Sequence, residues 1–243
     1  MKMDNLQWQD IDGALVATND IHKFGTDAVL LENFALKHAA TKICDLGAGC
    51  GIVSFLVSKR KKKCKLVALE IQEDAARLIE ASKEKNKTEN LKVVCADARD
   101  VQMLKKEVGN ADFDLVICNP PYYKEKSGAK SPYEERAIAR EENTLSIYDV
   151  ALIAKTLLKH GGRLCVCFKP ERLSELFDAM KKNTIEPKTM RMVYTSIDKK
   201  PWLVLVEGKK GAAPFLEVLP PLVMGSESGK NELEKIYSCV GCE

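Results

Sequence analysis

The chain has 243 residues and a net charge of +3, which suits one α/β domain and leaves no large basic field to indicate nucleic acid. Its nine cysteines are scattered singly and are odd in number, a pattern that favours reduced thiols over a disulfide framework. Residues 1–20 lack the apolar segment of a signal peptide and no apolar run could cross a bilayer, so a soluble cytoplasmic protein is predicted.

Apolar patterns and chain breakers predict strands that alternate with helices, which indicates a mostly parallel, doubly wound α/β sheet. The predicted helices are 26–38, 52–60, 73–85, 144–159 and 170–183, and the predicted strands are 43–46, 66–69, 91–96, 115–118 and 163–169. Strands 191–196 and 202–207 are close in sequence and predict an antiparallel edge. Thr26 is the expected cap of the first helix, with Asp27 in its first turn, where the helix dipole favours a negative charge. Gly161 and Gly162 are the expected end of helix 144–159.

The expected organisation is a single domain. A cap segment and helix occupy residues 1–40, the core sheet occupies 41–210, and an extension follows over 211–243. No internal repeat and no linker divides the chain. A monomer is expected.

A glycine-rich turn, Asp45-Leu-Gly-Ala-Gly-Cys-Gly51, follows the first predicted strand and opens a helix. Its glycines let the backbone turn tightly and approach a ligand closely. The spacing Gly-x-Gly-x-Gly differs from the Gly-x-Gly-x-x-Gly of dinucleotide sites, which disfavours a nicotinamide dehydrogenase. An acid at the strand end, Asp45, fits a ligand with an ammonium group, as in S-adenosylmethionine. A purely structural turn is the alternative.

Two acids stand at the ends of the next two predicted strands. Glu70 is placed to accept hydrogen bonds from both hydroxyls of a ribose, and Asp97 from an adenine amino group, with the amide of Ala98 nearby. Either acid alone is more often a solvated strand-end residue. Together they mark the edge where parallel sheets bind ligands.

The stretch after strand 115–118 is Asn119-Pro-Pro-Tyr122. The prolines cannot donate to a sheet and hold the Asn119 carboxamide, the Pro120 carbonyl and the Tyr122 ring in nearly fixed relation. Two acceptors beside an aromatic face suit a planar amide or a base with an –NH2 group. A rigid turn is the alternative interpretation.

Two basic regions differ in their expected position. Lys59 to Lys63 follow a helix that leads away from the ligand edge, so they are expected to be solvated cations at its end. A second group of cations follows the loop Asn119–Tyr122 and, with His22 and Lys23, can surround the pocket mouth and meet phosphates. These cations are Lys124, Lys126, Lys130, Arg136 and Arg140. Interspersed acids weaken that interpretation.

No metal site is predicted. Cys239 and Cys242 form a lone pair without the second ligand pair of a zinc site. Cys165 and Cys167 are expected in the core. His160 is expected at a helix end and His38 on a helix surface.

Several segments resemble the bacterial valine-tRNA adenine-N6 methyltransferases, and they span nearly the whole chain. They are Phe24-Gly-Thr-Asp-Ala-Val-Leu-Leu31, Asp45-Leu-Gly-Ala-Gly-Cys-Gly51, Ala68-Leu-Glu-Ile-Gln72, Cys118-Asn-Pro-Pro-Tyr-Tyr123, Ala137-Ile-Ala-Arg-Glu141, Val204-Leu-Val-Glu-Gly208 and Val218-Leu-Pro-Pro-Leu222. The resemblance implies a class I, Rossmann-like fold and methyl transfer from S-adenosylmethionine to the adenine beside the anticodon of valine tRNA. Glu141 stands where a histidine or aromatic residue is expected, so no role is assigned to it.

These expectations give three sets of site residues. The catalytic set is Asn119, Pro120, Pro121 and Tyr122. The cofactor-binding set is Lys23, Thr26, Asp45, Gly47, Ala48, Gly49, Gly51, Glu70, Ile71, Asp97, Ala98 and Asn119. The RNA-binding set is Tyr123, Lys124, Lys126, Lys130, Arg136 and Arg140.

The expected mechanism needs no covalent intermediate, because a sulfonium is already an activated methyl donor. Asn119 and the Pro120 carbonyl hold both amine protons, and Tyr122 stacks on the extruded base. One alternative is a glutamine methyltransferase of release factors, because a glutamine side chain presents the same –NH2 group to the same loop. Those enzymes resemble this chain but carry a helical domain before the glycine turn, for which about 40 residues are too few. The other alternative is a non-catalytic nucleotide-binding or RNA-binding subunit.

Overall fold

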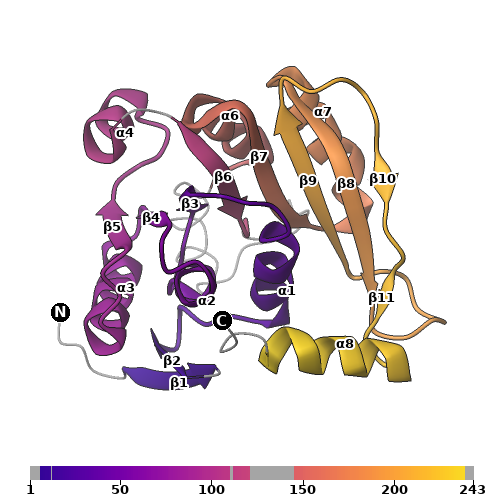
Figure 1. Cartoon of the computed structure of the whole chain (residues 1–243), viewed down its shortest axis with the longest axis horizontal. Helices are drawn as coiled ribbons and strands as arrows, with labels where there is room; N and C mark the ends of the chain where they lie inside the picture. Colours follow the sequence, from indigo (N-terminus) through magenta and orange to yellow (C-terminus); the bar gives the residue numbers. More distant parts are fainter. Residues whose placement is uncertain (1–5, 12, 110–111, 121–144, 239–243) are drawn as a thin grey trace, which may run out of the picture.

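The computed structural model describes residues 6–11, 13–109, 112–120 and 145–238 (Figure 1). Several predicted features therefore lie outside the described residues: Pro121, Tyr122, the whole RNA-binding set from Tyr123 to Arg140, and the pair Cys239 and Cys242. Within these ranges no helix is long and apolar enough to cross a membrane.

A nine-stranded sheet forms the centre of the described structure, in the order β10-β8-β9-β7-β6-β3-β4-β5, with β11 also beside β8 (Figure 1). Neighbouring strands from β5 to β7 are parallel, whereas β9 runs antiparallel to both β7 and β8. This confirms the predicted mostly parallel sheet with an antiparallel portion at one side. The strands are β3 Lys42–Leu46, β4 Lys65–Glu70, β5 Leu91–Cys95, β6 Phe113–Cys118, β7 Leu158–Phe168, β8 Ile185–Tyr194, β9 Leu203–Lys210, β10 Glu217–Val218 and β11 Leu222–Val223.

Two hydrophobic layers cover the two faces of this sheet, which explains the continuous apolar runs of its central strands. In β6, Leu115 and Ile117 pack into one layer, and Val116 and Cys118 pack into the other. Helices α1 (Thr26–Ala35), α2 (Ile52–Arg60) and α3 (Glu73–Asn86) supply the first layer. Helices α4 (Val101–Val108), α6 (Ile147–Leu157) and α7 (Leu173–Lys182), the last preceded by the 3₁₀ turn η1 (Pro170–Arg172), supply the second.

A hairpin and a helix that the sequence patterns did not predict extend the first layer. Strands β1 (Gln7–Ile11) and β2 (Ala14–Thr18) pair antiparallel beside α3, where the Asn86 carboxamide bonds to both backbone groups of Leu15 at 2.9 and 2.6 Å. Helix α8 (Glu227–Ser238) lies against α1, and its Ile236 is buried in the same layer (Figure 1). Helix α4 was also not predicted.

The glycine pair near residue 161 does not end a helix, contrary to the prediction. Helix α6 begins after a capping box at Ser146 and already ends at Leu157, and the chain is extended from Leu158. Gly161 has φ +77, and the register of β7 against β6 shifts here. The glycines therefore form an irregularity inside a strand, and His160 lies in that strand rather than at a helix end.

Thr26 is also not the cap of the first helix. The N-cap of α1 is Gly25, so Thr26 is its first helical residue. The Thr26 hydroxyl instead lies 3.4 Å from the Tyr237 hydroxyl of α8. Asp27 stands in the first turn, as predicted.

Candidate active site

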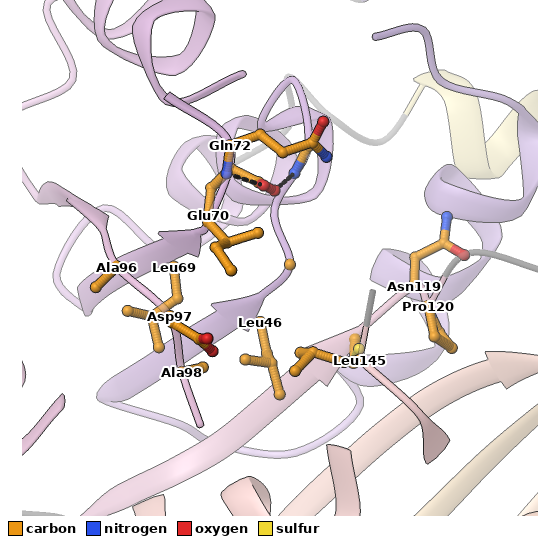
Figure 2. A pocket seen from close by; sticks show the side chains of 14 residues that line it. Leu46, Leu69, Glu70, Gln72, Ala96, Asp97, Ala98, Asn119, Pro120 and Leu145 are labelled. Carbon is orange, nitrogen blue, oxygen red and sulfur yellow. Dashed lines mark hydrogen bonds between the residues drawn. The ribbon is translucent and has the colours of Figure 1, made fainter. Parts of the chain in front are cut away.

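A hollow of about 210 Å³ opens at the carboxyl ends of the parallel strands (Figure 2). One water needs only about 10–15 Å³ of such space, so the hollow has the size of a ligand site. Figure 2 shows Glu70, Asp97 and Ala98 on one side and Asn119 and Pro120 on the other. The lining residues are Leu46, Gly47, Gly49, Leu69, Glu70, Ile71, Gln72, Ala96, Asp97, Ala98, Cys118, Asn119, Pro120 and Leu145.

The two sides are named here by their central residues. The glycine side consists of Gly47 and Gly49 after β3, Glu70 at the end of β4, and Asp97 and Ala98 after β5. The asparagine side consists of Asn119 and Pro120, which follow β6. Both sides lie at strand ends because parallel strands place their carboxyl ends at one edge of the sheet.

The glycine turn leaves open space above its backbone. Gly47 and Gly49 have φ of +71 and +56, which strains any residue with a side chain. A Cβ built on either glycine would meet no atom within 4 Å, so the space beside both is available to a ligand. Gly51 differs, because its Cβ would lie 3.0 Å from the side chains of Phe55 and Ile79, and it does not line the hollow.

Glu70 is a buried carboxylate with backbone partners. Its Oε2 accepts from the Gly49 amide and its Oε1 from the Gln72 amide, both at 2.8 Å. Burial raises the pKa of Glu70, and these amides oppose that rise. Since each carboxylate oxygen has two lone pairs, Glu70 retains acceptor capacity toward the hollow.

Asp97 is held by its neighbour Arg99. The Arg99 guanidinium reaches both carboxylate oxygens at 2.7 to 3.0 Å, and the Arg99 amide adds a bond of 2.9 Å to Oδ1. The Arg99 side chain holds the pKa of Asp97 below its usual value. Asp97 therefore presents an ionised carboxylate at the rim of the hollow.

Asn119 is held by two segments that are distant in sequence. Its Nδ2 donates to Asp27 Oδ2 of α1 at 3.2 Å, and its Oδ1 accepts from Cys167 Sγ of β7 at 2.9 Å. Asn119 is half-buried and Pro120 is buried. The carboxamide is thus fixed at the end of β6, at the border of the hollow.

Asp45 lies behind the glycine turn rather than in the hollow. It is 2% exposed, and its Oδ2 accepts from the Ser54 hydroxyl of α2 at 2.7 Å. Burial raises the pKa of Asp45 to about 7, although the Ser54 hydrogen bond opposes the rise. Asp45 therefore links β3 to α2 and is not among the residues that line the hollow.

The comparison that decides the family is a match to a family model. The model described as "Methyltransferase small domain" matches residues 20–182, which include the whole hollow. The chain belongs to the methyltransferase small domain family.

Two curated relatives of this methyltransferase domain carry the name "tRNA1(Val) (adenine(37)-N6)-methyltransferase". A relative from Porphyromonas gingivalis is 31% identical over 159 residues, covering 63% of this chain and 61% of the relative. A relative from Flavobacterium psychrophilum is 27% identical over 201 residues, covering 81% of this chain and 84% of the relative. The first match thus spans less than two thirds of the relative's length.

Solved structures share the fold. A predicted O-methyltransferase from Agrobacterium tumefaciens superposes with a TM-score of 0.71 at 22% identity, covering 88% of this chain and 96% of that one. TYW2 from M. jannaschii, solved in complex with AdoMet, gives 0.55 at 15% identity, covering 86% and 87%. At these identities the likeness concerns the fold alone.

The hollow brings together many of the residues that the sequence predicted for a site. The predicted residues that line it are Gly47, Gly49, Glu70, Ile71, Asp97, Ala98, Asn119 and Pro120. The predicted residues Lys23, Thr26, Asp45, Ala48 and Gly51 do not line it. Lys23 is exposed and lies 3.9 Å from Asp20.

Other residues of the hollow had not been predicted. Leu46 and Cys118 end apolar strands and Leu69 is next to last in its strand, so their position near strand ends was the available signal. Leu145 follows residues 121–144, which lie outside the described structure, and no sequence pattern indicated it as a site residue. Asp27 and Cys167 had been interpreted as a helix-end acid and a core thiol, and neither gave a signal of its contact with Asn119.

Proposed function

We propose that this methyltransferase uses S-adenosylmethionine to methylate the exocyclic N6 of an adenine in tRNA, and that the adenine lies beside the anticodon of valine tRNA. The observation that carries the proposal is the hollow that the glycine side and the asparagine side share. The names of the curated relatives support the choice of substrate.

The residues of the glycine side fit this cofactor. The open space at Gly47 and Gly49 admits a ligand close to the backbone. Glu70 has the acceptor capacity for ribose hydroxyls, and Asp97 with the Ala98 amide suits an adenine edge. When bound, S-adenosylmethionine supplies a methyl group on a sulfonium, which is already activated for transfer.

The asparagine side addresses the harder part of the reaction, because the adenine amine delocalises its lone pair into the ring. Asn119 Oδ1 and the Pro120 carbonyl are two acceptors that can hold the two amine protons and favour a more pyramidal nitrogen. Positioning and exclusion of water then supply most of the rate enhancement. No group of this chain needs to act as a general base if the amine proton leaves after transfer.

The RNA contacts remain a prediction from the sequence. We infer that Tyr122 stacks on the extruded base and that Lys124, Lys126 and Lys130 meet phosphates. The rival basic run Lys59 to Lys63 begins in the last turn of α2 and continues past its carboxyl end, and none of its residues lines the hollow. A cytoplasmic location is also proposed, and it agrees with the finding that none of the seven described cysteines forms a disulfide.

The test uses methyl-labelled S-adenosylmethionine with two tRNA transcripts that lack modification. One is valine tRNA, and in the other the adenine beside the anticodon is replaced by guanine. The expected result is N6-methyladenosine in digests of the first transcript and no label in the second.

A release factor incubated in parallel tests the alternative. Label recovered as N5-methylglutamine, with none in RNA, would replace this proposal by the glutamine methyltransferase. Calorimetric binding of S-adenosylmethionine without transfer to either substrate would favour a non-catalytic binding subunit.

A further inference from the structure

The contact between Asn119 and Asp27 joins the end of β6 to the first turn of α1. Asn119 Nδ2 donates to Asp27 Oδ2 at 3.2 Å across 92 positions of sequence. A contact of that sequence separation exists only because the sheet and α1 pack together. It therefore couples the reactive asparagine to the segment that the sequence analysis had assigned to a cap.

An ionised carboxylate only accepts hydrogen bonds, so it selects the –NH2 end of a carboxamide. With Nδ2 on Asp27, the oxygen is the acceptor end of the Asn119 carboxamide, and it accepts from Cys167 Sγ at 2.9 Å. A carboxamide that donates to a carboxylate also has a more negative oxygen, since hydrogen bonds in a chain polarise one another. Asp27 thereby selects and strengthens the acceptor.

Asp27 is itself held in place. Its Oδ1 accepts from the Ala28 amide at 2.9 Å, and the positive end of the α1 dipole favours its charge. A Cβ built on Gly25 would lie 2.8 Å from that Oδ1. Because Gly25 has the extended values φ −122 and ψ −178, which any residue adopts, this glycine supplies space for the carboxylate rather than backbone freedom.

We propose that Asp27 is a positioning residue for methyl transfer, which orients and polarises the Asn119 carboxamide toward the acceptor amine. The inference rests on the proposed function, because it assigns Asn119 Oδ1 to an amine. Asp27 acts through Asn119 and does not line the hollow.

The first test compares Asp27→Ala and Asp27→Asn with the parent. Asp27→Ala should lower kcat by about 10–100-fold, the usual effect of removing a group that orients a reactive residue. The KM for tRNA and the calorimetric Kd for S-adenosylmethionine should change less than about 3-fold, because Asp27 is not among the residues that line the hollow. Asp27→Asn should recover part of the rate, since its carbonyl can accept the same hydrogen bond without the charge.

Asp74→Ala is the matched control, because Asp74 is an exposed acid in the first turn of α3. It removes the same helix-end charge without touching Asn119. If Asp27→Ala and Asp74→Ala lower Tm alike and leave kcat alike, Asp27 has only a structural role and the inference is overturned.

The second test introduces a methyl group at Gly25. Gly25→Ala should lower kcat in the parent, where the new Cβ displaces the carboxylate. In the Asp27→Ala background the same change should lower kcat little further, so the effects of the two substitutions on kcat should be strongly non-additive. Additive effects would contradict a shared action through the carboxylate. A parent enzyme without activity on tRNA would instead refute the proposed function, which separates the two failures.

Discussion

The two sides of the hollow are supported in different ways. On the glycine side the partners are nearer in sequence: Glu70 bonds to the amide of Gly49, 21 positions away, and to that of Gln72, and Asp97 bonds to Arg99. On the asparagine side Asn119 is held by Asp27 and Cys167, which are 92 and 48 positions away. The comparison teaches that the ligand-binding side is built by contacts within a turn or between neighbouring strand ends, whereas the reactive side depends on segments that are much farther apart in sequence.

If the glycine side binds the cofactor and the asparagine side acts on the amine, Asn119→Ala should have the largest effect of these changes, and that effect should be on the methyl-transfer rate. The change removes one of two proposed acceptors of the amine, so the methyl-transfer rate should fall at least ~100-fold, the scale of losing one preorganised polar contact. Cofactor affinity should fall little. Single-turnover kinetics measures the rate, and Asn183→Ala, at the end of α7, is a matched control that should leave it unchanged. Transfer at the parent rate by Asn119→Ala would remove the central residue of the mechanism.

Glu70→Ala tests the role of the glycine side in cofactor binding. Loss of the carboxylate that faces the hollow should weaken S-adenosylmethionine binding by about 1–3 kcal/mol. Isothermal calorimetry measures the affinity, with exposed Glu73→Gln as the control. Unchanged affinity would show that Glu70 serves the turn at Gly49 and not the ligand.

Glu32 is a buried acid outside the hollow, and replacing it has the smallest expected effect of these changes, on stability rather than on cofactor binding. It is 0% exposed, lies 3.3 Å from Arg60 of α2, and burial raises its pKa to about 7. The folded state therefore keeps a proton that the unfolded state loses between pH 4.5 and 7. The free energy of unfolding should fall as pH rises through this range. Asp45, with a pKa raised to about 7, contributes in the same direction.

Glu32→Gln should reduce this pH dependence and stabilise the protein at pH 8 by on the order of 1 kcal/mol. Cofactor affinity should not change, in contrast to Glu70→Ala. Urea unfolding at pH 5.5 and pH 8 measures both free energies. A loss of stability that is equal at the two values of pH would mean that Glu32 is ionised throughout and that its pair with Arg60 stabilises the fold.

The same contrast between local and distant contacts explains how much the sequence predicted. The patterns predicted α2 and the cores of β3, β4 and β6 because short apolar runs and glycine turns determine them locally. Glu70 and Asp97 could be predicted for the ligand edge because strand ends share one edge of a parallel sheet.

The elements and contacts that the sequence did not predict depend on residues that are distant in sequence. The hairpin β1–β2 is held by Asn86 and Ser82 of α3, which are more than 60 positions away. Gly161 and Gly162 resemble a helix stop locally, but pairing with β6 draws the chain into a strand from Leu158. The contact of Asp27 with Asn119 needs the packed fold, so no local pattern indicates it.

The most direct test of the division of the hollow measures cofactor Kd and single-turnover methyl transfer for Asn119→Ala and Glu70→Ala in parallel. At saturating S-adenosylmethionine, Glu70→Ala should recover most of the parent rate, because its defect is in affinity. Asn119→Ala should remain at least ~100-fold slow at every cofactor concentration. Recovery of Asn119→Ala at high cofactor concentration, or a Glu70→Ala rate that stays equally low at saturation, would contradict the account.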